Sequence, residues 1–282
     1  MNKTLKNNQH VFNLVLKMLS ISALVLSTSA FAGAWVGEDG SVYLKLGYAD
    51  FSSDTYRGND PTFESFNGQN TSLYGEYGLG NDFSIYGSLL YQTYDQKYSV
   101  TGTSSAKGFS DTEIGLRYQW QADPFVLSTS FLVKTPFLYS KDDGLGNNQE
   151  DYEAKILIGK GLNEYGYFGV EVGYRLRTGD PSDEYRYLLE YGFNITPDVY
   201  FRTKLDGIFS AENSSAISTP NTGNLSNPLE FDSGKVELTT GYNFKENIAL
   251  KGLGVEFTYT REIYGKNILQ GDTFQLGITK AL

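Results

Sequence analysis

Acidic and basic side chains that could do chemistry recur at alternate positions in two neighbouring segments of this sequence. Glu171 precedes Arg175 and Arg177 in the first segment, and Arg186 precedes Glu190 in the second. Two facing carboxylates are the groups that glycosidases use as acid and base, whereas clustered arginines bind anions. Because each of these acids lies among bases, we interpret them as members of neutralised ion pairs and expect no catalytic carboxylate pair.

Composition restricts the other kinds of catalysis. The sequence has one histidine, His10, and no cysteine. Acyl-transfer and lipid-hydrolysing enzymes usually need a base that titrates near neutral pH, and histidine is the ordinary choice. We therefore expect no catalytic residues and no enzyme activity in this chain.

One segment, Asp142 to Asn147, offers several oxygen atoms of the kind that bind Ca²⁺. Its spacing does not match that of an EF-hand loop. A solvated surface loop is the preferred interpretation, and we expect neither a metal site nor a cofactor.

The charges stand in segments that alternate apolar and polar residues, from residue 41 to residue 282. Val42, Leu44 and Leu46 point to one side of their segment and Lys45 points to the other, as in a strand that separates an apolar medium from water. The pattern predicts strands at 41–51, 70–79, 83–97, 109–120, 125–138, 151–161, 167–178, 184–193, 199–209, 233–244, 253–264 and 272–282.

The breaks between these segments alternate in length. Turns of a few residues are separated by longer breaks at 52–69, 98–108, 139–150, 179–182, 211–232 and 265–271. Short periplasmic turns and longer outer loops are typical of transmembrane barrels. The sequence therefore predicts an all-β fold, namely a single antiparallel transmembrane β-barrel of about twelve strands with both termini in the periplasm.

The charged face of each strand must point into this barrel. A charge that faces lipid at the membrane centre costs about 2–4 kcal/mol, so many such charges are tolerated only in the lumen. The predicted lumen charges are Glu76, Glu113, Arg117, Lys134, Glu153, Lys155, Glu171, Arg175, Arg177, Arg186, Glu190, Arg202, Lys204, Asp206, Lys235, Glu237 and Glu256.

A candidate charge patch lies on the hairpin of strands 167–178 and 184–193 and on the next strand. If Thr178 pairs with Asp183, Arg175 faces Arg186 across the hairpin, which is a destabilising arrangement unless acids intervene. The patch is either an ion-pair network that fills a narrow barrel, which we favour, or an anion-attracting site near the outer mouth. Its candidate residues are Arg175, Arg177, Arg186, Glu171, Glu190, Arg202 and Lys204.

The N-terminus carries the features of an export signal. A basic start is followed by the apolar run 18–25 and by Ala30-Phe31-Ala32, a small-residue site for signal peptidase. We expect residues 1–32 to be a cleaved signal peptide and residues 33–282 to be the outer-membrane β-barrel domain. Without residues 1–32 the net charge changes from −10 to −13, which argues against nucleic-acid binding.

Partners follow from the predicted location in the cell outer membrane. The apolar strand faces would contact membrane lipid and lipopolysaccharide. The last strand places Phe274, Leu276, Ile278 and Leu282 on one face. This face resembles the signal by which the barrel-assembly machinery recognises its precursors, although Lys280 and Leu282 stand where aromatic residues are usual.

Short motifs across most of the mature chain carry a family resemblance. They are Ala34-Trp35, Gly40-x-x-Tyr43, Tyr74-Gly75-Glu76-Tyr77-Gly78-Leu79, Asp111-Thr112-Glu113-x-Gly115-Leu116-x-Tyr118, Gly173-Tyr174-Arg175-x-Arg177, Asp183-Glu184-Tyr185-Arg186 and Lys204-Leu205-Asp206-Gly207. With these motifs the chain resembles Gram-negative outer-membrane barrels of the XagA-like group and transporter barrels of phenol-degradation pathways. The resemblance implies a fold and a compartment, and it implies no substrate and no catalytic residue.

Two functions remain open from the sequence. The first, which we favour, is a passive channel or transporter for small hydrophilic or aromatic solutes, because about twelve strands lie between the filled eight-stranded and the open sixteen-stranded barrels. The alternative is a closed structural barrel that presents loops 52–69 and 211–232 to a partner or to exported polysaccharide.

Overall fold

The computed structural model describes residues 33–214, 224–244 and 250–282. The predicted signal peptide, residues 1–32, lies outside these residues. Most of the described chain is in antiparallel strands, because residues of alternating polarity can place one set of side chains on each face of a sheet. Within the described residues, no helix is long and apolar enough to cross a membrane.

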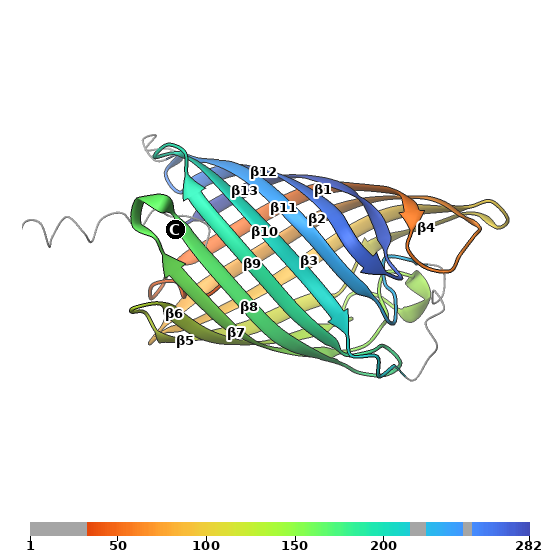
Figure 1. Ribbon diagram of the computed structural model, residues 1–282, viewed down its shortest axis with the longest axis horizontal. Helices are drawn as coiled ribbons and strands as arrows, with labels where there is room; N and C mark the ends of the chain where they lie inside the picture. Colours follow the sequence, from red (N-terminus) through yellow and green to blue (C-terminus); the bar gives the residue numbers. More distant parts are fainter. Residues whose placement is uncertain (1–32, 215–223, 245–249) are drawn as a thin grey trace, which may run out of the picture. The chain divides into compact units, whose positions relative to one another are not determined.

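The strands follow one another along the chain and tilt across the barrel wall (Figure 1). They are β1 (Val42–Tyr56), β2 (Phe63–Gly80), β3 (Phe83–Tyr98), β4 (Gly102–Phe109), β5 (Thr112–Gln121), β6 (Val126–Thr135), β7 (Asp151–Gly161), β8 (Tyr167–Arg177), β9 (Glu184–Asn194), β10 (Val199–Ser210), β11 (Asp232–Asn243), β12 (Leu253–Lys266) and β13 (Leu269–Ala281). Two short 3-10 helices, η1 (Lys141–Asp143) and η2 (Asn163–Tyr165), lie in connections.

The sheet closes on itself through β1, which pairs with both β2 and β13, and through β2, which also pairs with β3. The first half of β3, Phe83–Ser88, pairs with β5, and its second half, Tyr91–Tyr98, pairs with β4. The result is a closed twelve-stranded antiparallel barrel with β4 as one extra strand. The predicted all-β barrel of about twelve strands is confirmed.

Three predicted loops differ from the structure, and the shortest of them, 265–271, is reduced to residues 267–268 between β12 and β13. β1 continues to Tyr56 and β2 begins at Phe63, so most of the predicted loop 52–69 is strand, and β4 forms within the predicted loop 98–108. Aromatic packing explains why the strands continue. Phe66 stacks on Tyr94 with ring centroids 5.4 Å apart and contacts Phe51 edge to face at 5.8 Å, which gives the extended hairpins an apolar core.

The two faces of the wall are as predicted. On β1, Leu44 and Leu46 are 40% and 50% exposed on the outside, whereas Lys45 points inward to an ion pair with Glu256. On β13, Phe274, Leu276 and Ile278 are exposed in the same way. The outer surface is therefore apolar and the lumen is charged, as a membrane-spanning barrel requires.

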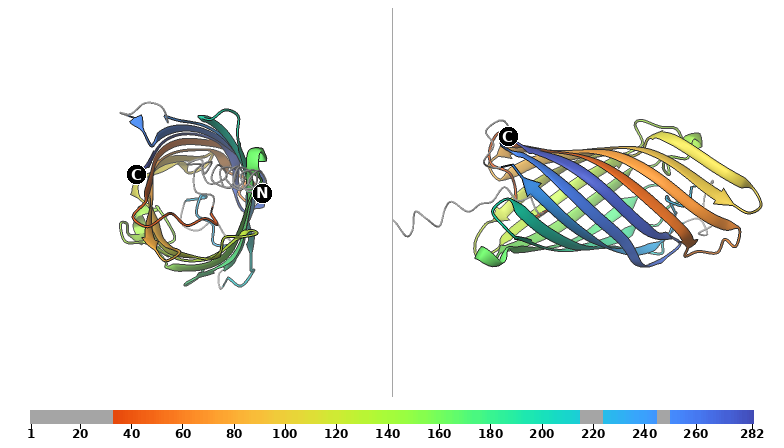
Figure 2. Two further views of the ribbon diagram at one scale, coloured as in Figure 1. Left: turned by 90° about the vertical axis from the view of Figure 1, so that its left-hand side faces the viewer. Right: turned by 90° about the horizontal axis from the view of Figure 1, so that it is seen from above.

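The connections differ between the two ends of the barrel. One end, which we name the short-turn end, carries the turns β2–β3, β5–β6 and β9–β10 together with η2, and the C-terminus lies there (Figure 1). The opposite end, which we name the long-loop end, carries the connections 136–150 and 178–183, the described residues 211–214 and 224–231 between β10 and β11, and the β3–β4 hairpin. Figure 2 shows the barrel end-on and from a second side.

Candidate functional site: the charged lumen

Each of the predicted lumen charges forms at least one ion pair with another inward-pointing side chain. This arrangement follows from the strand period, because residues two apart on one strand and directly opposite on the next strand share a face. The lumen wall is therefore a set of charge networks.

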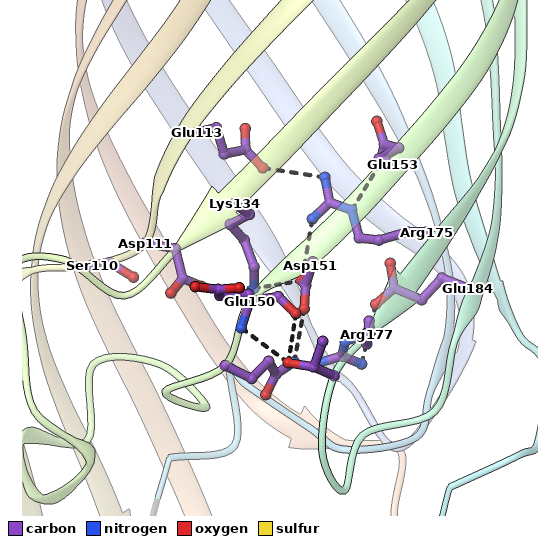
Figure 3. A network of polar contacts seen from close by, with 12 residues as sticks. Ser110, Asp111, Glu113, Lys134, Glu150, Asp151, Glu153, Arg175, Arg177 and Glu184 are labelled. Atoms are coloured by element: carbon purple, nitrogen blue, oxygen red, sulfur yellow. Dashed lines mark hydrogen bonds and ion pairs between the residues drawn. The ribbon is translucent and has the colours of Figure 1, made fainter.

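The largest network surrounds Arg175 near the long-loop end (Figure 3). Its Nε donates to Glu153 Oε2 over 2.7 Å, and its Nη2 donates to Glu113 Oε1 over 3.2 Å. A third carboxylate, that of Asp151, lies 3.8 Å from its Nη1. The Arg175 side chain is 10% exposed, so this guanidinium is surrounded by acids and largely removed from the open lumen.

Lys134 extends the network toward the connection 136–150. Its Nζ lies 2.8 Å from both Asp111 Oδ2 and Asp151 Oδ2. Tyr139 donates its hydroxyl to the other oxygen of Asp111 over 2.6 Å. Burial of Tyr139, together with this hydrogen bond and the Asp111 charge, raises its pKa far above the usual value. The hydroxyl therefore stays protonated and holds the connection to the wall.

The predicted pairing of the β8–β9 hairpin is wrong. Arg175 stands opposite Glu184, and Arg186 stands opposite Gly173, so the two arginines do not face each other. The observed register is shifted by two residues from the predicted one, which keeps every side chain on its predicted face. It places an acid across from Arg175 and a residue without a side chain across from Arg186, which removes the repulsion between like charges.

Glu184 then joins the two remaining arginines of the hairpin. Arg177 Nη1 lies 3.1 Å from Glu184 Oε1, and Arg186 Nη1 lies 3.3 Å from Glu184 Oε2. Arg186 also contacts Glu153 at 3.4 Å. The structure therefore brings Arg175, Arg177 and Arg186 into one network through shared carboxylates.

The other predicted patch residues are divided among networks. Glu171 joins the first one, because Lys155 lies 3.3 Å from it and 3.0 Å from Glu153. A separate pair links Lys204 and Glu190 at 3.1 Å. Arg202 lies 3.7 Å from Glu256, which also pairs with Lys45. The seven candidates thus line the same lumen without forming a single patch.

Exposure separates the bases that reach the open lumen from those that do not. Arg177 is 5% exposed, whereas Arg186 is 21%, Lys204 is 25% and Lys235 is 38% exposed. Sequence reasoning missed this distinction, and it missed Glu184 as a partner of the arginines. Both depend on the register between strands, which the alternation of residues does not encode.

Residues 33–37 lie inside the barrel at the short-turn end (Figure 2, left). Ser128 donates its hydroxyl to the Ala34 carbonyl, and Arg117 donates to the Trp35 carbonyl over 3.0 Å. The Trp35 ring meets the inward-pointing Tyr167 ring edge to face at 5.7 Å. This segment occupies part of the lumen, and no motif in the sequence indicates it.

The segment 142–147 is the expected solvated loop only in part, because Asp142 and Asp143 are exposed but Leu145 is not. Leu145 is 3% exposed, and its carbonyl accepts hydrogen bonds from the Gln92 amide and the Ser110 hydroxyl. Within the described residues, no three His, Cys, Asp or Glu side chains are grouped as a metal site requires.

Comparison with known proteins places the fold. No protein-family model matches the chain, and no curated protein matches it in sequence. An outer-membrane channel from Pseudomonas putida F1 has a similar structure, with a TM-score of 0.69 at 13% identity over 90% of this chain and 100% of that chain. The NanC porin has a TM-score of 0.54 at 10% identity, over 85% and 98% of the respective chains.

A third neighbour is the translocator domain of the autotransporter NalP from Neisseria meningitidis. Its TM-score is 0.53 at 10% identity, over 98% of this chain and 97% of that chain. At such identities the likeness shows the fold alone. The chain therefore has the fold of outer-membrane β-barrels, a class whose neighbours here are channels, porins and a translocator.

Proposed function

We propose that the chain is a passive outer-membrane channel for small hydrophilic or aromatic solutes. The observation that carries the proposal is a closed twelve-stranded barrel with an apolar outer face and a lumen lined by charged side chains. Eight-stranded barrels are filled by side chains and sixteen-stranded ones contain an aqueous channel, so this barrel has room for a narrow pore.

The proposed orientation places the short-turn end in the periplasm and the long-loop end outside the cell. Residues 1–32 would be removed as a signal peptide before the barrel-assembly machinery inserts residues 33–282. The apolar outer face would then contact lipid and lipopolysaccharide. The likeness in fold to outer-membrane channels supports this location, and membership of the XagA-like or phenol-pathway barrels remains a prediction.

The charge networks line the wall of the proposed channel. Removing one partner of a buried ion pair costs about 3–5 kcal/mol, because the other charge stays buried without a counter-charge. The Arg175 network therefore makes the wall rigid. The more exposed bases, which a passing solute would meet, are Lys45, Lys155, Arg186, Lys204 and Lys235. We propose that they bias permeation toward anions, because low-dielectric walls focus the field of charges at a constriction.

A second candidate function is the closed structural barrel. The observation that favours it is that residues 33–37 lie in the lumen at one end and Leu145 is buried at the other. The surfaces offered to a partner would then be the β1–β2 hairpin, in place of the predicted loop 52–69, and the predicted loop 211–232, of which residues 215–223 lie outside the described residues.

Liposome swelling separates the two functions. Proteoliposomes loaded with an impermeant polymer are diluted into an isosmotic solution of a small neutral sugar or of a small organic anion. A channel produces swelling that exceeds that of protein-free liposomes. Liposomes that hold folded barrel and do not swell with any small solute would favour the structural barrel.

A further inference from the structure

Two connections at the long-loop end fold inward over the lumen. They are residues 136–150, between β6 and β7, and residues 224–231, at the end of the connection from β10 to β11. The first buries Leu145, which is 3% exposed, and the second buries Leu225 and Leu229, which are 2% and 5% exposed. Connecting loops usually run over the protein surface, so a leucine in a loop is buried this fully only when the loop packs on a core.

Leu225 fills a socket formed by Phe66, Tyr94 and Leu269, which we name the aromatic socket. These three residues come from β2, β3 and β13, so the socket is part of the barrel wall. The Leu225 amide also donates to Gln96 Oε1 over 2.9 Å. Residue 225 is thus held to the wall by one apolar contact set and one buried hydrogen bond.

The connection 136–150 is attached to the same wall. Its Leu145 carbonyl accepts hydrogen bonds from Gln92 Nε2 at 2.8 Å and from Ser110 Oγ at 2.7 Å. The neighbouring Gly144 carbonyl accepts one from the Tyr94 hydroxyl at 3.2 Å. These three bonds join neutral groups, so each holds the connection more weakly than a charge-assisted bond would.

The two connections meet at one atom. The Asn224 side chain donates from Nδ2 to the Gly144 carbonyl over 2.7 Å. Tyr94 lies beneath both, because its ring lines the aromatic socket and its hydroxyl reaches Gly144. The two segments therefore share contacts, and movement of one removes contacts of the other.

Arg177 holds the far end of the segment 224–231. Its Nη1 donates to the Leu229 carbonyl at 3.3 Å and lies 3.1 Å from Glu184, and its guanidinium lies 5.9 Å from the centre of the Phe231 ring. The Ser182 amide donates to the same Leu229 carbonyl over 2.9 Å. The base of the segment thus has charge-assisted contacts, which are stronger than the neutral contacts at its tip.

We propose that residues 136–150 and 224–231 form a two-part lid over the long-loop end, and that the channel opens when Leu225 leaves the aromatic socket. Arg177 is a positioning residue that keeps the base of the lid attached in both states. Below the socket on β2 the inward residues Asn70 and Ser72 are uncharged and half-buried, so an open lid leads into solvent-accessible lumen. The lid rests on the proposed channel function.

Thiol labelling tests the lid without reference to conduction. The chain has no native cysteine, so Leu225→Cys introduces one reactive group, and Val100→Cys, at a site that is 77% exposed, supplies the reference rate. The lid predicts labelling of Cys at 225 at least tenfold slower than at 100, and faster labelling when Asn224→Ala removes the contact to Gly144. Equal rates at 225 and 100 would overturn the closed lid.

Cross-linking connects the lid to the channel. In the variant Leu225→Cys/Leu269→Cys, a short bifunctional thiol reagent with a cleavable disulfide ties the lid to β13, and Leu225→Cys alone is the control. We expect the cross-link to abolish single-channel steps and its reduction to restore them. Unchanged steps after complete cross-linking would overturn the lid while leaving the channel standing. A silent wild-type protein would instead contradict the channel, and the labelling rates would still decide whether the lid opens.

A third variant measures how much the burial of Leu225 in the aromatic socket contributes to keeping the lid closed. Leu225→Ala removes most of the buried apolar surface and should raise the labelling rate of a cysteine at 224 by roughly tenfold or more, because burial of a leucine is worth about that factor or above. Val100→Ala in the same background should leave the rate unchanged. Arg177→Gln should release the base as well, and retention of a heat-modifiable gel band shows that each variant is folded.

Discussion

Arg175 on β8 stands opposite Glu184 on β9, and its guanidinium is also shared by Glu153 and Glu113. The arrangement places one buried cation among several carboxylates. In such a cluster the removal of the cation leaves uncompensated negative charge, whereas the removal of an exposed charge leaves little. We therefore expect the position of a base in the lumen, more than its type, to decide whether its removal lowers stability or changes permeation through the proposed channel.

The first prediction compares two arginines of this hairpin. Arg175→Gln should lower the free energy of unfolding by about 3–5 kcal/mol, because the acids around it lose their counter-charge. Arg186→Gln should cost less, because Arg186 is 21% exposed. Urea unfolding curves of each variant, recorded on protein whose heat-modifiable migration shows that it is folded, measure both losses. Arg261→Gln, on a residue that is 55% exposed, is the control, and an equal loss for Arg175 and Arg261 would refute the buried network.

The second prediction concerns ion selectivity. Arg186→Gln should move the reversal potential of the channel in a salt gradient toward cations, because Arg186 reaches the open lumen. Arg175→Gln should change the reversal potential less. If Arg186→Gln leaves selectivity unchanged, the anion-biasing role of this base is wrong and the arginines of the hairpin serve packing alone.

Lys134 provides a third test, because it lies between two acids. Lys134→Gln leaves Asp111 and Asp151 without their shared counter-charge, so we expect a loss of about 3–5 kcal/mol in unfolding free energy. Lys97 pairs with Glu64 on the surface and is 59% exposed, so Lys97→Gln should cost at most about 1 kcal/mol. Similar denaturation midpoints for the two variants would contradict the bridging role of Lys134.

The strand faces could be predicted from the sequence and the strand register could not. Alternation fixes which side chains point inward, and Lys45 and Glu256 indeed meet in the lumen. A shift by two residues preserves every face, so the sequence pattern did not distinguish Arg186 from Glu184 as the residue opposite Arg175. The choice depends on charge pairing and on the connection 178–183, which are tertiary properties.

The inward position of Leu225 was also outside the reach of the sequence pattern. Its segment is rich in Ser, Asn, Thr and Gly and indicates an outer loop. The contacts that turn it inward come from Phe66, Tyr94 and Leu269, which are distant in sequence. Local composition carries no information about such partners. The same holds for Trp35, which lies against Tyr167.

The fourth prediction uses pH. Asp183 lies in the β8–β9 connection, where burial opposes its charge but hydrogen bonds from the Arg177 amide, Tyr174 and Asn213 lower its pKa below the usual value. Its contribution to stability is therefore present above the unfolded-state pKa of about 3.9 and is lost as the pH falls through the lower folded-state pKa.

Asp183→Asn should thus reduce stability at neutral pH and flatten the acid limb of the stability profile. The temperature at which half of the protein loses its folded, heat-modifiable gel band, recorded between pH 3 and pH 7, measures this. Asp54→Asn, at an exposed position of β1, is the control. If Asp183→Asn loses stability at low pH in the same way as the wild type, Asp183 does not contribute to that loss.

The fifth prediction concerns the short-turn end. In the wild type the Trp35 ring contacts Tyr167 and narrows the lumen at this end. Trp35→Ala removes that ring. We expect larger single-channel steps than in the wild type, because ion flow depends on the open cross-section. Trp120→Ala, at a ring that is 62% exposed outside the barrel, should leave the step size unchanged. Equal steps in both variants would indicate that residues 33–37 do not limit the flow.

Single-channel recording of the wild-type protein in planar lipid bilayers tests the central claim most directly. Purified barrel, shown to be folded by its heat-modifiable migration, is added to one chamber under an applied voltage in a salt gradient. The proposed channel predicts reproducible discrete openings with a reversal potential on the anion-selective side. Folded barrel that inserts and stays silent over many bilayers would contradict the channel and favour the structural barrel.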